Sequence, residues 1–190
     1  MRRAFDTILL VAVALVIWQA IHLLAPSALT SPLGTARRAA ELLGTATFWP
    51  HVAETLKAFL YALILAFTGG LLLGLLLGLN KTGAKVADPI LVSIYSLPKV
   101  TLYPVILLIF GLGMSAKVAF GTIHGIIPIA IFAMNSVRNL APVYLKTARV
   151  LHLSKAETLR PVVIPAAIPE IVSGLRIGFS LTLLGVLIGE

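Results

Sequence analysis

Five apolar segments, each close to the length of a bilayer-spanning helix, set the main limit on how this chain folds. They cover residues 7–25, 56–79, 89–111 and 118–137, and a last one runs from about residue 166 to the end. A helix needs about 20 mostly apolar residues to cross the hydrocarbon core. Backbone polar groups inside a bilayer must bond within the protein, and runs of this length satisfy that as helices. The sequence therefore predicts an all-α integral membrane bundle with about five spans in one domain, residues 1–190.

Composition agrees with a membrane protein and excludes several other classes. The chain is 59% hydrophobic, with a mean hydropathy of +1.03, which is far too apolar for a soluble domain of this size. Its net charge of +8 comes from basic residues scattered among spans and short loops, so no nucleic-acid-binding face is expected. Without cysteine, the chain has no disulfide or thiolate metal site.

No catalytic, cofactor or metal site is predicted. The four histidines have no metal-ligand spacing, and the few carboxylates are dispersed. The nearest approach to a phosphate-binding loop, residues 74–82, has Asn80 where a glycine must precede the lysine. Any ATP hydrolysis therefore belongs to another chain, and this one is not an enzyme.

Basic residues predict the orientation, because short cytoplasmic segments carry an excess of lysine and arginine. With the N-terminus inside, nine basic residues are cytoplasmic and four lie outside. The inner set is Arg2, Arg3, Lys81, Lys85, Arg138, Lys146, Arg149, Lys155 and Arg160, and the outer set is Arg37, Arg38, Lys57 and Lys117. We therefore expect a cytoplasmic N-terminus and an uncleaved first span, with a cleaved signal peptide as the alternative.

The sequence ends at Glu190 inside a hydrophobic run. This suggests a C-terminally truncated chain whose sixth span is missing, and a genuine short form is the alternative. Residues 35–43 predict an amphipathic helix at the outer membrane surface. Glycines at helical spacing predict close helix packing, either within the chain or between subunits. They are Gly70, Gly74 and Gly78 in the second span, and Gly174 and Gly178 in the last.

A polar island between the fourth and fifth apolar segments, residues 142–169, is the main functional candidate. Pro142 is suited to open a helix, and Tyr144, Ala148 and Leu151 then share one face. A turn follows at His152 and Leu153. Ser154 and Glu157 have the spacing of a capping box that starts a second helix. Two short helices around a capped turn predict a surface held at the inner face for another protein to bind, although an ordinary basic loop is possible.

The island resembles the EAA loop of ABC-importer permeases, the membrane subunits of binding-protein-dependent uptake systems. Lys146, Thr147 and Ala148 occupy the EAA positions, His152 occupies the usual glycine position, and residues 163–165 match the closing hydrophobic-Pro pattern. Further similarity to the nitrate/sulfonate/taurine branch lies in residues 31–32, 97–99, 103–104, 110–113 and 174–176. Two positions depart from the pattern: Lys146 reverses the usual acidic charge, and His152 must tolerate a left-handed turn.

The resemblance implies a fold, partners and a mechanism. The chain is expected to be a type I ABC-importer permease in a bacterial or archaeal inner membrane, multi-pass, importing nitrate, sulfonate, taurine or a similar small solute. Expected partners are an ABC ATP-binding subunit, a periplasmic or lipid-anchored substrate-binding protein, a second permease copy and membrane lipid. The coupling loop, residues 142–165, would transmit the ATPase's closure as a rigid push. Its contact residues would be Tyr144, Lys146, Thr147, Ala148, Leu151, His152, Leu153, Ser154 and Glu157.

Three polar residues inside apolar segments are candidates for the transport pathway, because ionisable side chains at membrane depth are usually functional. Lys99 follows the helix-breaking Pro98 and would favour anionic substrates; a lysine bound to carbonyls freed at the break is the alternative. His124 and Arg176 are the other two. A secondary transporter and a degenerate, non-transporting scaffold remain as alternative functions, although the spans hold almost none of the acids that ion coupling uses.

Overall fold

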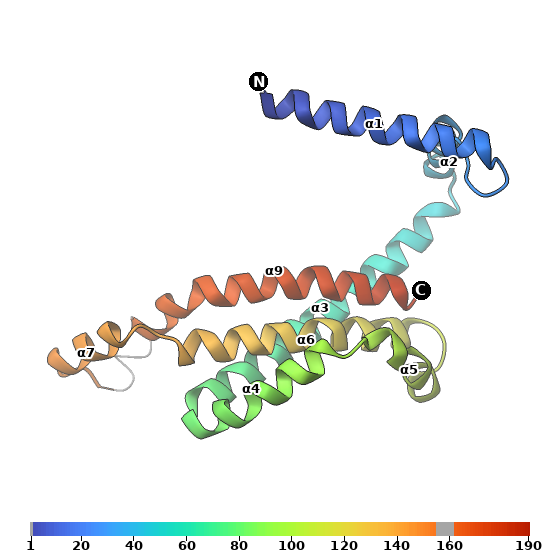
Figure 1. Ribbon diagram of the computed structural model, residues 1–190. Helices are drawn as coiled ribbons and strands as arrows, with labels where there is room; N and C mark the ends of the chain where they lie inside the picture. Colours follow the sequence, from blue (N-terminus) through green and yellow to red (C-terminus); the bar gives the residue numbers. More distant parts are fainter. Residues whose placement is uncertain (1, 155–161) are drawn as a thin grey trace. The chain divides into compact units, whose positions relative to one another are not determined.

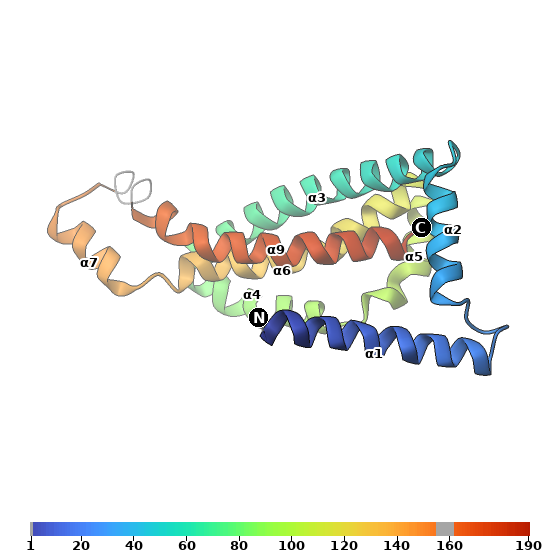
Figure 2. The same ribbon diagram turned by 90° about the horizontal axis from the view of Figure 1, so that it is seen from above.

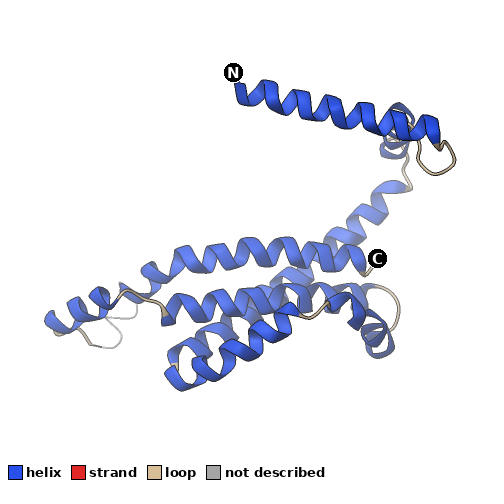
Figure 3. Ribbon diagram, in the orientation of Figure 1, coloured by secondary structure: helices blue, strands red, loops and turns tan. Residues whose placement is uncertain are grey.

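The computed structural model describes residues 2–154 and 162–190, and the described part of the chain is helical without strands (Figures 1 and 3). Among the described residues, four helices are long and apolar enough to cross a membrane, or five if one bent helix pair counts as a single span. The predicted all-α membrane bundle is therefore confirmed. The contacts divide the chain into a first unit that ends at Ala53 and a second unit, Glu54–Glu190, and each is described by itself.

The first unit holds the helices α1 (Arg2–Leu24) and α2 (Pro32–Leu43). The loop between them is fixed by two α1 side chains: Trp18 Nε1 donates to the carbonyl of Thr30 at 2.9 Å, and His22 Nδ1 lies 2.7 Å from that of Leu29. Ser31 caps α2 through its hydroxyl. The helix predicted for residues 35–43 is present and starts three positions earlier, at Pro32, because proline fits the first helical turn.

Helix α6 (Met114–Arg138) is the centre of the second unit. Most of α3 (Phe48–Leu79) packs on one side of it, and α9 (Ile164–Ile188) runs beside it in the opposite direction (Figures 1 and 2). Twelve residues of α6 are buried, among them Phe120, Ile129 and Met134. Because α6 is covered on several sides, polar groups on this helix must find partners inside the protein.

Glycines bring the three long helices into close contact. A Cβ added at Gly70, Gly74 or Gly78 of α3 would overlap backbone or side-chain atoms of α6. On α9, Gly174 and Gly178 lie in the same way against Phe132 and Ile129 of α6. These faces pack within the chain, which is the first of the two alternatives that the spacing left open. The sequence reading missed Gly121, Gly125 and Gly185, which complete the α6–α9 contact.

The third apolar segment, expected at residues 89–111 with a helix break at Pro98, starts earlier than expected and bends sharply at the break. The helix α4 (Lys81–Ser96) begins earlier than expected, because the Asn80 side chain accepts from the amides of Thr82 and Gly83. It ends before Pro98, as the sequence predicted. A 3₁₀ turn, η1 (Lys99–Leu102), and α5 (Tyr103–Phe110) follow, and the two halves are bent by 82°. The segment is therefore a broken span or a re-entrant loop.

Candidate functional site

Helix α7 (Pro142–Val150) projects beyond the ends of α6 and α9 that lie nearest to it (Figures 1 and 2). It ends in a left-handed turn: His152 has φ 50°. The amide of Leu153 donates to the carbonyl of Ala148 at 3.0 Å, and the amide of Leu151 donates to that of Thr147 at 2.9 Å. The hydrogen bond from Leu153 back to Ala148, together with the positive φ of His152, defines a Schellman motif. This motif normally has glycine at the position of His152. The turn expected at His152 and Leu153 is therefore confirmed.

An open hollow of about 530 Å³ lies between α7 and the start of α9. Its lining is mainly apolar: Val143, Tyr144, Thr147, Ala148, Leu151, Leu153, Val162, Pro165 and Ala166. The face that the sequence assigned to Tyr144, Ala148 and Leu151 is therefore the face that borders the hollow. Ala148 is buried, whereas Tyr144 and Leu151 remain 45% and 62% exposed. Lys146 is exposed, and its position on the helix is opposite to this face.

The second half of the predicted docking element falls outside the described residues. Glu157, Lys155, Arg160 and Pro161 belong to this part of the chain. Ser154 is described, and it takes part in an interaction within the structure. The capping box of Ser154 and Glu157, and the short helix that it would start, therefore stay predictions.

Lys99 lies in the 3₁₀ turn at the break of the third apolar segment and is 9% exposed. Its ammonium group donates to the carbonyl of Tyr95 at 2.9 Å and lies 4.8 Å from the centre of the Tyr95 ring. The Tyr95 carbonyl is near the end of α4, where carbonyls lack helical partners. None of the ion pairs among the described residues includes Lys99. This contact with a carbonyl at the helix break is the alternative that the sequence left open for Lys99, and a pathway role for Lys99 stays a prediction.

His124 is 6% exposed on α6, and its Nδ1 lies 2.9 Å from the carbonyl of Phe120. Since a carbonyl only accepts, Nδ1 carries the proton in this bond. The imidazole also packs edge-on against the Phe120 ring, with 4.5 Å between centroids. The Phe120 ring in turn contacts that of Tyr103, with 5.1 Å between centroids, so α6 packs here against the start of α5. A pathway role for His124 stays a prediction.

Arg176 is the third pathway candidate, and its surroundings differ from those of Lys99 and His124. It is exposed on α9 and borders a shallow hollow with Val172, Leu175, Phe179 and Ser180. The described residues contain no ion pair between it and Glu170, because side chains six residues apart do not share a helix face. A pathway role for Arg176 stays a prediction.

The sequence did not identify Lys117 as a buried residue, because its position near a loop suggested a charge on the outer side of the membrane. It lies in the first turn of α6 and is 9% exposed. Its ammonium group lies 3.2 Å from Glu54 Oε1 and 3.1 Å from Glu190 Oε1. The hydroxyl of Thr55 donates to the same Glu190 carboxylate at 2.7 Å. The Lys117 ammonium therefore joins α3, α6 and the second residue after α9.

An ion pair marks the other end of α6. Arg138 Nη1 lies 2.6 Å from Asp88 Oδ2, which joins the last residue of α6 to α4. Both side chains are about one third exposed, so the pair adds little stability. Its position matters more, since α7 begins four residues after Arg138. The pair fixes the point from which the chain leaves the bundle toward α7.

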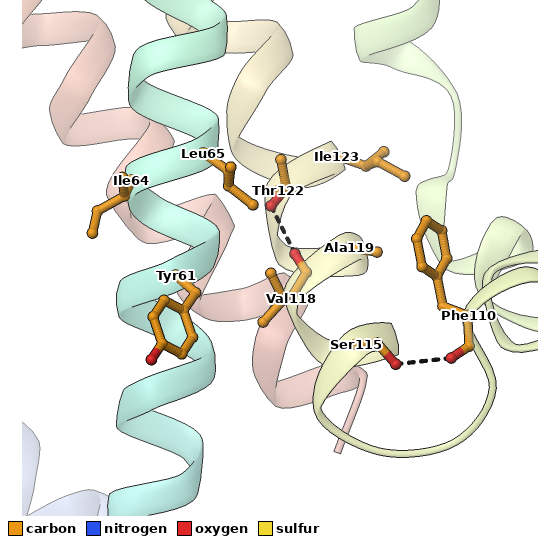
Figure 4. A pocket seen from close by; sticks show the side chains of 9 residues that line it. All are labelled: Tyr61, Ile64, Leu65, Phe110, Ser115, Val118, Ala119, Thr122 and Ile123. Carbon is orange, nitrogen blue, oxygen red and sulfur yellow. Dashed lines mark hydrogen bonds between the residues drawn. The ribbon is translucent and has the colours of Figure 1, made fainter.

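A second hollow, of about 680 Å³, opens between α3, α5 and α6 (Figure 4). Its lining is almost wholly apolar: Tyr61, Ile64, Leu65, Phe110, Ser115, Val118, Ala119, Thr122 and Ile123. Of the three hydroxyls drawn there, those of Ser115 and Thr122 donate to the backbone carbonyls of Phe110 and Val118, and the third belongs to Tyr61. Because its lining is almost wholly apolar, this surface suits an apolar neighbour such as lipid rather than a polar solute.

Comparison with known proteins places this architecture in a family. Residues 70–190 match the family model described as "Binding-protein-dependent transport system inner membrane component". A probable ABC transporter permease protein of Haemophilus influenzae is 32% identical, over 99% of this chain and 77% of its own length. The taurine transport system permease protein TauC of Escherichia coli is 30% identical, over 88% of this chain and 64% of its own length.

A third relative shows the range of transport systems among similar proteins. The nitrate import permease protein NrtB of Leptolyngbya laminosa is 28% identical, over the whole of this chain and 71% of its own length. The chain thus spans about two thirds to three quarters of these three relatives.

Proposed function

This chain belongs to the family of binding-protein-dependent transport system inner membrane components, the permeases of ABC transporters, and from this premise we propose its role. It is the membrane-spanning subunit of an ATP-driven importer and forms the pathway for a small anion or organic solute such as nitrate, a sulfonate or taurine. A separate ATP-binding subunit hydrolyses ATP, a substrate-binding protein delivers the solute outside, and a second permease copy completes the pathway. The N-terminus and α7 are cytoplasmic, in a bacterial or archaeal inner membrane.

The family match carries the proposal, and α7 supports its coupling part. The helix projects from the bundle, and its Schellman turn leaves apolar side chains beside an open hollow. Tyr144 and Leu151 are large and exposed there, and tyrosine is enriched among the residues that anchor a partner. The Asp88–Arg138 pair holds the base of this projection. A push on α7 would therefore reach α4 and α6 together.

Co-purification tests the coupling part. The chain and an ABC ATP-binding subunit are expressed together, and the ratio of the two in the purified complex is measured. We expect Tyr144→Ala combined with Leu151→Ala to release the ATPase. Val150→Ala is the matched control, because Val150 is 76% exposed on the same helix but does not border the hollow. Full retention of the ATPase by the double variant would contradict α7 as the docking element.

Lys99 supports an anionic substrate. A buried ammonium group without a carboxylate partner is costly in a membrane interior, and the carbonyl and ring of Tyr95 compensate its charge only in part. A substrate anion would complete the compensation. Lys117, the other buried lysine, differs from Lys99 because two carboxylates already contact its ammonium group. Uptake into vesicles by the assembled importer tests this: Lys99→Met should reduce anion uptake at least tenfold, and unchanged uptake would remove Lys99 from the pathway.

A further inference from the structure

The apolar hollow between α3, α5 and α6 lies beside an exposed lysine on the same helix face. Lys57 is exposed on α3 and comes one helical turn before Tyr61, which lines the hollow. Residues four apart on a helix are neighbours, with about 5–6 Å between their Cβ atoms. Leu65, one turn further along, lines the hollow too. The charge of Lys57 and the lining of the hollow therefore follow one another along one face of α3.

The place of Lys57 along α3 is that of a residue at the membrane surface. The helix has 32 residues, which extend about 48 Å, whereas the hydrocarbon core is about 30 Å thick. Its apolar run begins at Leu56, so Lys57 lies where the helix enters the hydrocarbon. Figure 4 shows the Tyr61 hydroxyl directed toward the start of α3. Tyrosine rings at a membrane surface are typically placed in this way, with the hydroxyl at headgroup level.

The carboxylates near Lys57 are engaged elsewhere. Glu54, three residues before Lys57, lies 3.2 Å from the ammonium group of Lys117. Glu190 lies 3.1 Å from the same ammonium group. None of the ion pairs within residues 2–154 and 162–190 includes Lys57. Its positive charge is therefore available to an anion outside the chain.

The hollow suits a hydrocarbon chain. It has a volume of about 680 Å³, and its lining is almost wholly apolar. Four of its lining side chains are about half exposed: Tyr61, Ile64, Leu65 and Phe110. The hollow borders α3 and α6, two of the candidate spans, so its open side meets the bilayer. A methylene chain there gains packing contacts and leaves no polar group without a partner.

We propose that this face of α3 and the hollow beside it form a binding site for one anionic phospholipid. The phosphate group binds the Lys57 ammonium at the membrane surface, and one acyl chain lies in the hollow past Tyr61. Charge complementarity selects the headgroup, because a lysine at headgroup level attracts anionic lipids. The site goes beyond the proposed transport role, since its occupant is a lipid that stays bound rather than a solute that passes through.

Native mass spectrometry tests the site in the full chain, released from nanodiscs of equal parts phosphatidylglycerol and phosphatidylcholine. The two lipids carry the same acyl chains and differ in the net charge of the headgroup. We expect one retained phospholipid per chain, with phosphatidylglycerol enriched about fivefold, the factor that one lysine near an anionic surface contributes. Equal retention of the two lipids would overturn the charge selection. A chain that retains neither lipid would overturn the site.

Three variants locate the lipid. Lys57→Gln should lower the enrichment to about onefold while one lipid is still retained. Lys85→Gln is the matched control, because it removes an equal exposed charge from α4, outside the lining of the hollow, and should keep the fivefold enrichment. Equal losses in these two variants would contradict a headgroup site at Lys57.

Ala119→Phe places a ring inside the hollow and should reduce retention of both lipids at least fivefold. Unchanged retention would show that the acyl chain does not occupy the hollow. Because Ala119 also packs against buried residues of the core, the exposed Lys57→Gln change tests the site without affecting the packing of the bundle.

Discussion

The ammonium nitrogen of Lys117 lies 3.1 Å from Oε1 of Glu190, which joins the first turn of α6 to the second residue after α9. Glu54 at 3.2 Å adds α3 to the same contact. Two carboxylates thus share one cation, and their mutual repulsion is relieved only while Lys117 lies between them. The three long helices are fixed to one another by this charge at one end and by their glycine faces along their length.

Replacing Lys117 with methionine should lower the free energy of unfolding by about 2 kcal/mol, since hydrogen bonds to charged groups contribute about that much. The loss also leaves Glu54 and Glu190 facing each other without a cation. Thermal unfolding of the purified chain in detergent measures the effect. Glu54→Gln is the control: it leaves a one-to-one pair of Lys117 with Glu190 and should cost less. An equal loss in both variants would contradict the shared-cation arrangement.

The Asp88–Arg138 pair should affect the base of α7 more than the stability of the bundle. A pair that is about one third exposed contributes about 0.5 kcal/mol or less. Asp88→Asn should therefore leave the unfolding temperature nearly unchanged. Amide hydrogen exchange at Asn139 and Leu140, which link α6 to α7, should speed up severalfold. Lys85→Gln, on the same helix as Asp88, is the control. Equal exchange rates in both variants would show that the Asp88–Arg138 pair does not hold the base of α7.

His152→Gly should stabilise the end of α7. A non-glycine residue in the left-handed region costs about 1 kcal/mol, and His152 has φ 50°. Hydrogen exchange at the amides of Leu151 and Leu153, which donate to the last turn of α7, should slow about threefold to fivefold. His152→Val is the opposing variant, because β-branched residues tolerate this region poorly. Faster exchange in the glycine variant would show that the turn needs the histidine side chain.

The apolar segments could be predicted from sequence because hydropathy and length determine whether a helix spans a membrane. The break at Pro98 was equally accessible, since proline removes a helical hydrogen bond. The earlier start of α4 was missed, because Asn80 as a cap is a weak local signal next to the strong hydropathy that begins later. The turn at His152 and Leu153 was predicted from the residues of the polar island, and the family pattern added the left-handed conformation at His152, a residue type that tolerates positive φ better than most.

Contacts between distant segments lay beyond the sequence. Lys117 looked like an ordinary outer charge, and nothing in its neighbourhood indicates Glu54 or Glu190 as partners. The contact of Tyr103 with Phe120 depends on how the bent α4–α5 segment packs on α6, and periodicity does not encode that packing. Small residues were recognised as packing surfaces, but the spacing left the identity of the facing helix open.

Gly74→Ala should disturb the α3–α6 contact. The added Cβ would overlap the carbonyl of Ala130 and the side chain of Ala133, so the helices must separate. Overpacking of this kind typically costs about 1–3 kcal/mol, and the unfolding temperature should fall. Gly83→Ala on α4 is the matched control, because its Cβ would meet nothing closer than 3.4 Å. That change should be neutral or slightly stabilising, and equal losses at both sites would contradict the packing.

Thr182→Val should stabilise the α6–α9 interface. The Thr182 hydroxyl is fully buried against Gly125 and, among the described residues, is the only buried side-chain polar atom without a hydrogen-bond partner. Valine has the same shape and no hydroxyl, so the substitution removes an unmet polar group without opening a cavity. The gain should be about 1 kcal/mol, read as a higher unfolding temperature. Thr122→Val is the matched control, because the Thr122 hydroxyl donates to the carbonyl of Val118 at 2.7 Å. The control should be neutral or destabilised, and a loss of stability in Thr182→Val would mean that this hydroxyl is bonded in the membrane.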